Sequence, residues 1–131
     1  MTQEDKELLL KDLCSRLPYG VKVEYDNCAC EVISIDKDTK ELTIWKCFGY
    51  SPGVELENVK PYLFPISSMT EEQKEEFNTQ SLKLQLQVID EEIMYEKATE
   101  FEVDFYNKHH LDWRGLIPKG LAIDATDKNI Y

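Results

Sequence analysis

The chain has 131 residues, of which 42% are hydrophobic, and its formal net charge is −11 at pH 7. A chain of this length forms one domain with a core of its own. The negative charge argues against direct binding to nucleic acid or anionic lipid, because each contact with a phosphate would begin against repulsion, and it suits a basic protein as partner.

The first ten residues, MTQEDKELLL, are acidic and predict neither a secretory leader nor a transit peptide. No apolar run approaches the roughly 18 residues that a membrane-spanning helix needs. We therefore expect a cytoplasmic protein that has no contact with a membrane. In that compartment the four cysteines, Cys14, Cys28, Cys30 and Cys47, are expected to be thiols.

The N-terminal half predicts one helix followed by a small sheet. Thr2 and Asp5 have the spacing of a capping box, and leucines recur at helical intervals until Pro18. Segments rich in β-forming residues follow, with turns expected at 36–40 and 49–53. The expected strands are 21–25, 29–35, 41–48 and 54–59. Short strands at this spacing are typical of a meander, so we expect a small antiparallel sheet or an SH3-like barrel.

The C-terminal half predicts mostly helix. Residues 60–68 contain two prolines and should cross to it as an extended segment. A short helix is expected to begin at Thr70, which has Gln73 at capping-box spacing. The segment SLKLQLQV, residues 81–88, alternates strictly between apolar and polar residues after its first position and so predicts a strand. Residues 90–110 give the strongest helical pattern, with an apolar stripe formed by Met94, Ala98, Phe101 and Phe105.

These elements predict a single α+β domain over residues 1–131. One lobe, residues 1–66, would contain the N-terminal helix and the β-meander. The other, residues 67–131, would be rich in helix.

Residues 107–126, NKHHLDWRGLIPKGLAIDAT, hold both histidines and one of the two tryptophans. One interpretation is an active site, and the other, which we favour, is a structural clasp. His109 stands where a cation suits the end of a helix, Asp112 has the chemistry of a cap for the next turn, and Gly120 lets the chain reverse. Large apolar side chains would then fold back onto the stripe of the preceding helix. The predicted clasp residues are Trp113, Leu116, Ile117 and Leu121.

The cysteines and histidines leave a second class of function open. Cys28 and Cys30 would point to the same side of a strand, and Cys47 with His109 or His110 would complete a metal site. Zinc sites commonly use two pairs of cysteines separated by two to four residues, whereas this chain has a single Cys-x-Cys. A cysteine nucleophile needs a histidine within hydrogen-bonding distance, and no local motif accompanies any of the cysteines. Buried thiols that act as small apolar groups are the simpler interpretation.

The acidic ridge, defined here as residues 90–104, contains seven acidic residues and one lysine. A solvated helix face would account for it, and so would a surface that binds a basic protein. Its candidate contact residues are Glu92, Glu96 and Glu100. The glycines match neither nucleotide-binding fingerprint, and nothing marks two of the 26 carboxylates as an acid and a base. We therefore assign no catalytic, metal-binding or cofactor-binding residue and expect no cofactor.

Three segments resemble a family of uncharacterised small proteins of Bacteroides-type gut bacteria and their phages and prophages. They are DKELLLKDLCSRLPYGVKV at 5–23, VKPYLFPISSMTEEQKEEF at 59–77 and HHLDWRGLIPKGLAIDAT at 109–126. The resemblance implies a cytoplasmic protein of a mobile element and transfers no catalytic or binding residue. The sequence thus favours a non-catalytic acidic protein-interaction module of a phage or prophage. The alternative is a small enzyme or metal-binding protein that uses cysteine and histidine.

Overall fold

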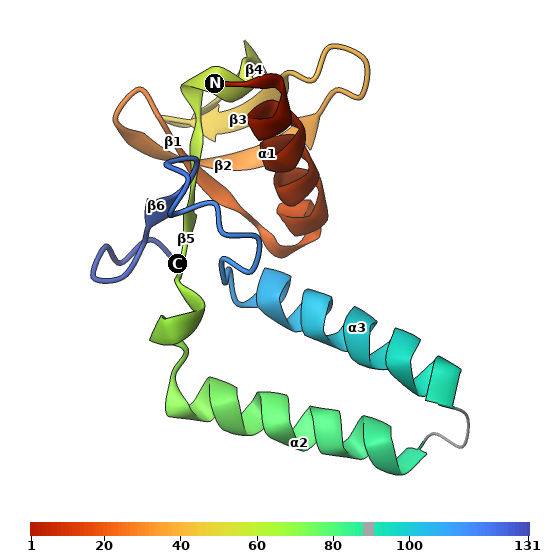
Figure 1. Ribbon diagram of the computed structural model, residues 1–131. Coiled ribbons are helices and arrows are strands. Elements are labelled where there is room, and N and C mark those ends of the chain that lie inside the picture. The colour runs from red at the N-terminus through yellow and green to blue at the C-terminus, as the bar shows by residue number, and fades with distance from the viewer. Residues whose placement is uncertain (88–90) are drawn as a thin grey trace.

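The computed structural model describes the backbone of residues 1–87 and 91–131 and the side chains outside residues 83–99. The first half contains α1 (Gln3–Arg16), β1 (Lys22–Tyr25), β2 (Cys28–Ile35), β3 (Leu42–Lys46), β4 (Gly49–Val54) and β5 (Lys60–Leu63). The second contains α2 (Glu71–Gln87), α3 (Glu91–Lys108) and the short strand β6 (Ile123–Asp124). Three short 3-10 turns separate these elements: η1 (Leu17–Tyr19), η2 (Leu56–Asn58) and η3 (Ile66–Ser68). Figure 1 shows α2 and α3 side by side, extending away from the sheet.

Six strands form one sheet in the order β4-β3-β2-β1-β5-β6. All pairings among strands β1 to β5 are antiparallel, and the pairing of β5 with β6 is parallel. Strands β4 and β6 stand at opposite edges, so the sheet is open. The α+β fold predicted from the sequence is therefore confirmed in its alternative of a small, mostly antiparallel sheet, and the described strands do not close into a barrel.

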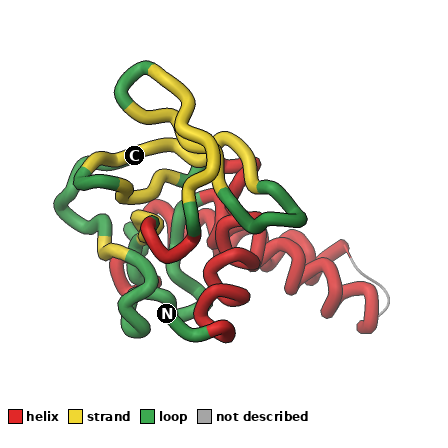
Figure 2. Tube along the Cα trace, turned by 90° about the horizontal axis from the view of Figure 1, so that it is seen from above, coloured by secondary structure: helices red, strands yellow, loops and turns green. Residues whose placement is uncertain are grey.

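The hydrophobic core lies between α1 and one face of the sheet. Figure 2, seen from above, shows most of the strands along one side of the molecule and the long helices along the other. Leu9 and Leu13 of α1 are fully buried against alternate residues of the strands. The inward-facing core residues of the sheet include Val21, Val23, Cys30, Val32, Leu42, Ile44, Val54 and Leu63. None of the described helices lies over the opposite face of the sheet, and large exposed side chains are found on that face.

Both predicted capping boxes are present. At α1, the Thr2 hydroxyl accepts a hydrogen bond from the Asp5 backbone N–H at 3.1 Å, and the Thr2 N–H donates to the Asp5 carboxylate at 3.4 Å. At α2, the same reciprocal bonds join Thr70 and Gln73 at 3.1 and 3.0 Å. Each box satisfies backbone donors that a helix start leaves unpaired, which explains why both helices begin where the sequence predicts.

The prediction for residues 49–59 is wrong in detail. The sequence predicts a turn at 49–53 and a strand at 54–59, whereas the structure has β4 at Gly49–Val54 followed by η2. Among the described strands β4 is at the edge of the sheet and has β3 as its one neighbour, so the missing N–H of Pro52 is tolerated there. Gly53 has φ +71° and lies where the register between β3 and β4 shifts, which is a position for a β-bulge.

The strand predicted at 81–88 is also wrong, because this segment is helical to Gln87. It continues α2, which is 17 residues long instead of short. Leucine, lysine and glutamine are strong helix formers, and a helix already started by its capping box and packed against α3 extends through them despite their alternation. A period of two places successive leucines on opposite faces of a helix, and Leu82 is accordingly exposed. Val88 and the side chains of Leu84 and Leu86 lie outside the described residues.

Helix α3 is confirmed, and an aromatic residue of α2 covers its apolar stripe. The ring of Phe77 lies 5.4 Å from that of Phe101 and 5.2 Å from that of Phe105, between ring centres. Phe105 is buried as a result. The side chains of Met94 and Ala98, the other two residues of the stripe, lie outside the described residues.

The clasp residues are largely buried, but in a different place from the one expected. Leu116 and Leu121 belong to the core between α1 and the sheet, and Ile117 packs against that core. Trp113 contacts α3 through Tyr106, 6.4 Å away between ring centres, and its indole N–H donates to the side-chain oxygen of Asn107 at 3.0 Å. The segment therefore joins α3 to the core, and the Phe101–Phe105 stripe that was expected to receive it is covered by α2 instead.

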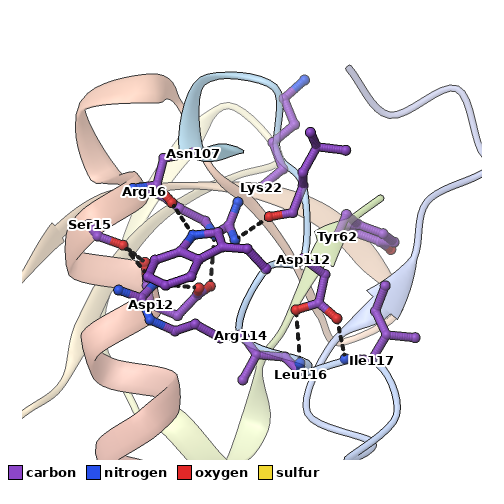
Figure 3. A network of polar contacts seen from close by, with 12 residues as sticks. Asp12, Ser15, Arg16, Lys22, Tyr62, Asn107, Asp112, Arg114, Leu116 and Ile117 are labelled. Carbon is purple, nitrogen blue, oxygen red and sulfur yellow. Dashed lines mark hydrogen bonds and ion pairs between the residues drawn. The ribbon is translucent and has the colours of Figure 1, made fainter. Parts of the chain in front are cut away.

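Buried charged groups fix the clasp, as Figure 3 shows. The carboxylate of Asp112 accepts hydrogen bonds from the backbone N–H groups of Leu116 and Ile117 at 2.8 and 2.9 Å, which agrees with the predicted cap. The carboxylate of Asp12 on α1 binds Arg16 at 2.9 Å and Arg114 of the clasp at 2.8 Å. Residues 112–117 are thus held by hydrogen bonds within the segment and by an ion pair to α1.

The turn between α3 and the clasp depends on His110. This residue has φ +57°, and hydrogen bonds from His110 N–H to Asn107 C=O and from Leu111 N–H to Tyr106 C=O complete a Schellman motif. The imidazole stacks on the ring of Tyr131, with 3.6 Å between ring centres. Burial, followed by the positive charges of Arg16, His109 and Lys22, lowers the pKa of His110 to about 4.

We expect Leu116→Ala to lower the free energy of unfolding by about 2 to 5 kcal/mol, because it leaves a cavity in the core. Trp113→Phe should cost about 1 to 3 kcal/mol, because the buried side-chain oxygen of Asn107 loses its donor. The control is Lys119→Ala, at an exposed position of the same turn, which should change stability by less than about 0.5 kcal/mol. Urea denaturation measures all three. A Leu116→Ala variant as stable as the control would contradict the clasp.

We expect acid to weaken the fold through His110. Its pKa is lower in the folded chain than in the unfolded chain, so its contribution is complete above about pH 6.5 and is lost as the pH falls towards 4. Because the ring keeps some solvent contact, the loss should be about 1 to 2 kcal/mol. His110→Asn keeps a residue that tolerates positive φ and removes the titration. Denaturation at pH 7 and pH 4.5 should therefore show a smaller difference for the variant, and equal differences would refute this role.

Candidate interaction surface

The uncovered face of the sheet carries large exposed side chains. Side chains alternate between the two faces along each strand, so the residues between the core positions of β2, β3 and β4 point away from α1. Glu31 lies opposite Trp45, and Trp45 lies opposite Tyr50. Trp45 is 39% exposed and Tyr50 is 66% exposed. Ile33 adds a further exposed apolar side chain to this face.

Trp45 and Tyr50 form a cross-strand aromatic pair. Their ring centres are 4.8 Å apart and their planes meet at 75°, which is an edge-to-face arrangement. Such pairs contribute about 0.5 to 1.5 kcal/mol beyond the area that they bury. The pair therefore stabilises the β3–β4 hairpin and fixes both rings in position on the surface.

The tip of the β3–β4 hairpin is strained and apolar. Lys46 pairs with Gly49, so Cys47 and Phe48 form a two-residue turn, with φ of +50° and +67°. Positive φ at both positions is the geometry of a type I′ turn, for which asparagine and glycine are favoured. For other residues this conformation costs about 1 to 2 kcal/mol each. The Phe48 side chain is nevertheless 95% exposed, so no intramolecular packing offsets that cost.

The neighbouring β1–β2 hairpin provides a comparison within the same molecule. Its turn, Asp26 and Asn27, has the same positive φ angles at residues that tolerate them. Asp26 binds the Lys46 ammonium at 2.6 Å, and this hydrogen bond lowers the pKa of Asp26 and raises that of Lys46. Lys46 also lies over the ring of Tyr25. The ion pair joins the two hairpins and so holds in place the β3–β4 hairpin, which carries Cys47 and Phe48 at its tip. We call Trp45, Phe48 and Tyr50 the aromatic hairpin surface.

The cysteines do not gather with the histidines. Cys28 and Cys30 are on β2, Cys47 is at the hairpin tip, and His109 and His110 follow α3. Among the side chains that the structure describes, no group of three or more histidine, cysteine or acidic residues is arranged to hold a metal ion. Cys30 is buried, and burial raises the pKa of its thiol. It thus fits the interpretation of a cysteine that acts as a small apolar group.

His109 has a structural environment between the two long helices. Its Nδ1 is 3.4 Å from the side-chain nitrogen of Gln73, and its Nε2 is 3.5 Å from a carboxylate oxygen of Glu76. Its ring also contacts that of Phe105, with 4.5 Å between centres. These contacts join α3 to α2, and they do not bring the imidazole to a thiol.

The acidic ridge is helical from residue 91 onward, and the side chain of one of its three candidate contact residues is described. Glu100 is exposed on α3, as are Glu102 and Asp104 further along the helix. The side chains of Glu92 and Glu96 lie outside the described residues. The structure therefore places Glu100 at the surface, and the exposure of Glu92 and Glu96 stays a prediction.

The sequence contained a signal for the aromatic hairpin surface. The segment IWKCFGY, residues 44–50, carries three aromatic residues over seven positions. Its first part was predicted as a strand and its end as a turn, which left open the face to which each ring points. Only the register of β3 with its two neighbours shows that Trp45 and Tyr50 share the uncovered face.

Comparisons with protein-family models, with curated proteins and with solved structures find no match to this chain. A search of the described helices finds none with the length and apolar character needed to cross a membrane. The function must therefore be argued from the surface itself.

We expect Phe48→Gly to raise the free energy of unfolding by about 1 to 2 kcal/mol, because glycine adopts the left-handed conformation without the steric cost. Asn27→Gly, at the equivalent position of the β1–β2 turn, is the matched control and should change stability by less than half as much. Thermal and urea denaturation provide the measurement. If the two substitutions had the same effect, the β3–β4 turn would not be strained.

Proposed function

We propose that the protein is a non-catalytic interaction module of the cytoplasm, which uses the aromatic hairpin surface to dock onto a basic protein. The observation that carries this proposal is Phe48, a large apolar side chain with 95% of its surface exposed, in a backbone conformation that disfavours it. Neither the exposure nor the conformation helps the isolated fold. Backbone strain of this kind is found mostly at residues that have a function. Burial of the Phe48 side chain in a partner protein would be such a function.

The composition of the surface supports protein binding. Aromatic residues, tryptophan and tyrosine above all, are enriched among the side chains that contribute most to protein interfaces. Trp45 and Tyr50 are held rigidly by their mutual contact and by strand pairing, so little conformational entropy would be lost when a partner covers them.

The charge of the chain supports a basic partner. At a net charge of −11, the protein repels phosphate groups and attracts positively charged surfaces over several ångströms. The acidic ridge, with Glu92, Glu96 and Glu100, is proposed as a second region of attraction. For a protein of a phage or prophage, as the resemblance implies, the partner would be a protein of the host cell.

The test compares proteins retained from host-cell extract by the unchanged protein and by Phe48→Gly, a variant expected to fold at least as well. Loss of a hot-spot side chain usually costs 2 kcal/mol or more, so we expect Phe48→Gly to weaken binding of the partner about 30-fold or more, measured by calorimetry with the purified partner. Binding should also weaken as salt rises.

Reversal of Glu92, Glu96 and Glu100 to lysine separates the two regions. If this variant lost the partner while Phe48→Gly retained it, the interface would lie on α3 and the hairpin proposal would be wrong. Tight binding of DNA, RNA or vesicles that depends on Phe48 would likewise contradict the proposal that the partner is a protein.

A further inference from the structure

We propose that Trp45, Tyr50 and Glu31 form a receptor for one cationic side chain, a lysine or an arginine, of the bound partner. This inference rests on the proposed function and adds to it the chemistry of a contact residue. The three residues lie on β2, β3 and β4, directly opposite one another across the sheet and on its uncovered face. We call them the cation corner.

Both rings are partly exposed to solvent. Their planes meet at 75° in an edge-to-face contact, in which the edge of one ring meets the face of the other, and none of the described helices lies over them. Each ring therefore keeps at least one face that the other ring does not cover. An aromatic face is negative, and it attracts an ammonium or guanidinium group placed within about 6 Å of the ring centre. Glu31 is next to Trp45 in the register and is exposed, and one oxygen of its carboxylate lies 3.7 Å from the position that a Cβ would take at Gly20. Its full negative charge is therefore on the same face of the sheet, on the Gly20 side of Glu31.

Other aromatic residues of the chain already hold a cation from within the molecule. Lys46 lies 5.2 Å from the ring centre of Tyr25, Arg114 lies 4.0 Å from that of Trp113, and Lys22 lies 5.8 Å from that of Tyr131. Among the described side chains, none is placed in this way over Trp45 or Tyr50. The two aromatic rings of the cation corner therefore have no cation of the described chain over them, and a bound partner could provide one.

The carboxylate of Glu31 is likewise not paired with a cation among the described side chains. Lys22 stands opposite Glu31 in the pairing of β1 with β2, but its ammonium group donates to the backbone carbonyl of Ile130 at 3.0 Å. Within the described part of the chain, no ion pair involves the Glu31 carboxylate. An incoming cation would thus meet an unneutralised carboxylate in a protein that is already strongly acidic, whereas an anionic group would be repelled.

The experiment follows the two indole N–H signals of the isotope-labelled full chain by NMR. The probes are three blocked tripeptides, Gly-Arg-Gly, Gly-Lys-Gly and Gly-Gln-Gly, titrated into the millimolar range. We expect the arginine and lysine peptides to shift the Trp45 signal with saturation, and the glutamine peptide to leave it unchanged. Trp113, whose ring Arg114 already occupies, is the internal control and should not respond.

Two variants test the residues. Tyr50→Ala and Glu31→Gln should each weaken the binding of the arginine peptide about two- to fivefold, the range expected for one exposed cation–π or ionic contact. Glu75→Gln removes an exposed carboxylate from α2 and should change nothing. Equal shifts with the glutamine peptide, or no effect of Glu31→Gln, would overturn the cation corner.

The result is separable from that of the proposed function. If the partner is lost on Phe48→Gly but is insensitive to Glu31→Gln, and the cationic peptides give no shift, the docking hairpin stands and the cation corner is wrong. If the peptides bind as expected but partner binding is indifferent to Phe48, the corner is a cation site and the docking proposal is wrong.

Discussion

Asp12 holds the two halves of the molecule together. Its carboxylate is fully buried and lies between the guanidinium groups of Arg16 and Arg114, one on its own helix and the other about a hundred residues further along the chain. Arg16 also donates to the backbone carbonyl of Leu111 at 2.6 Å. Buried charges are tolerated only when they are paired and hydrogen-bonded, so the positions of α1 and of residues 111–114 depend on each other.

This arrangement decides which surface is free to act. The clasp and α1 occupy the inner face of the sheet, and Leu116 and Leu121 of the clasp complete the core there. Helices α2 and α3 pack on each other through Phe77 and Phe105. Nothing in the described chain covers the outer face of β2, β3 and β4, where exposed aromatic side chains are combined with a strained turn. The aromatic hairpin surface thus stays exposed because the clasp and the helices pack elsewhere, in the core and against each other.

Local patterns in the sequence were sufficient for elements whose stability is local. The capping boxes at Thr2 and Thr70 and the β-forming residues of segments 21–25 and 29–35 identify elements that the structure contains. The prediction failed where an element depends on its neighbours. Pro52 is acceptable in β4 only because β4 is at an edge, and the segment around Leu82 is helical because it continues a helix that packs on α3.

The candidate site was less accessible from the sequence than the fold. A prediction of β-strand for residues 41–48 does not say that Trp45 faces away from the core, because a shift of register by one residue would reverse it. The left-handed conformation of Phe48 is equally invisible, since phenylalanine disfavours it. Asp12 and Arg16, four residues apart on a helix, have the spacing of an ordinary surface pair, and only the packing of distant Arg114 and Leu111 shows that they are buried.

The parallel pairing of β5 with β6 has a consequence for the order of events during folding. Tyr62 pairs with Ile123, so the sheet gains its last strand only after both long helices have been synthesised. Contacts between residues so far apart in the chain close large loops and therefore form slowly. The β3–β4 hairpin, in contrast, has only local contacts between its strands and can form early. During synthesis the aromatic hairpin would thus be displayed before the core is complete, at a stage when exposed apolar surface is most prone to misassociation.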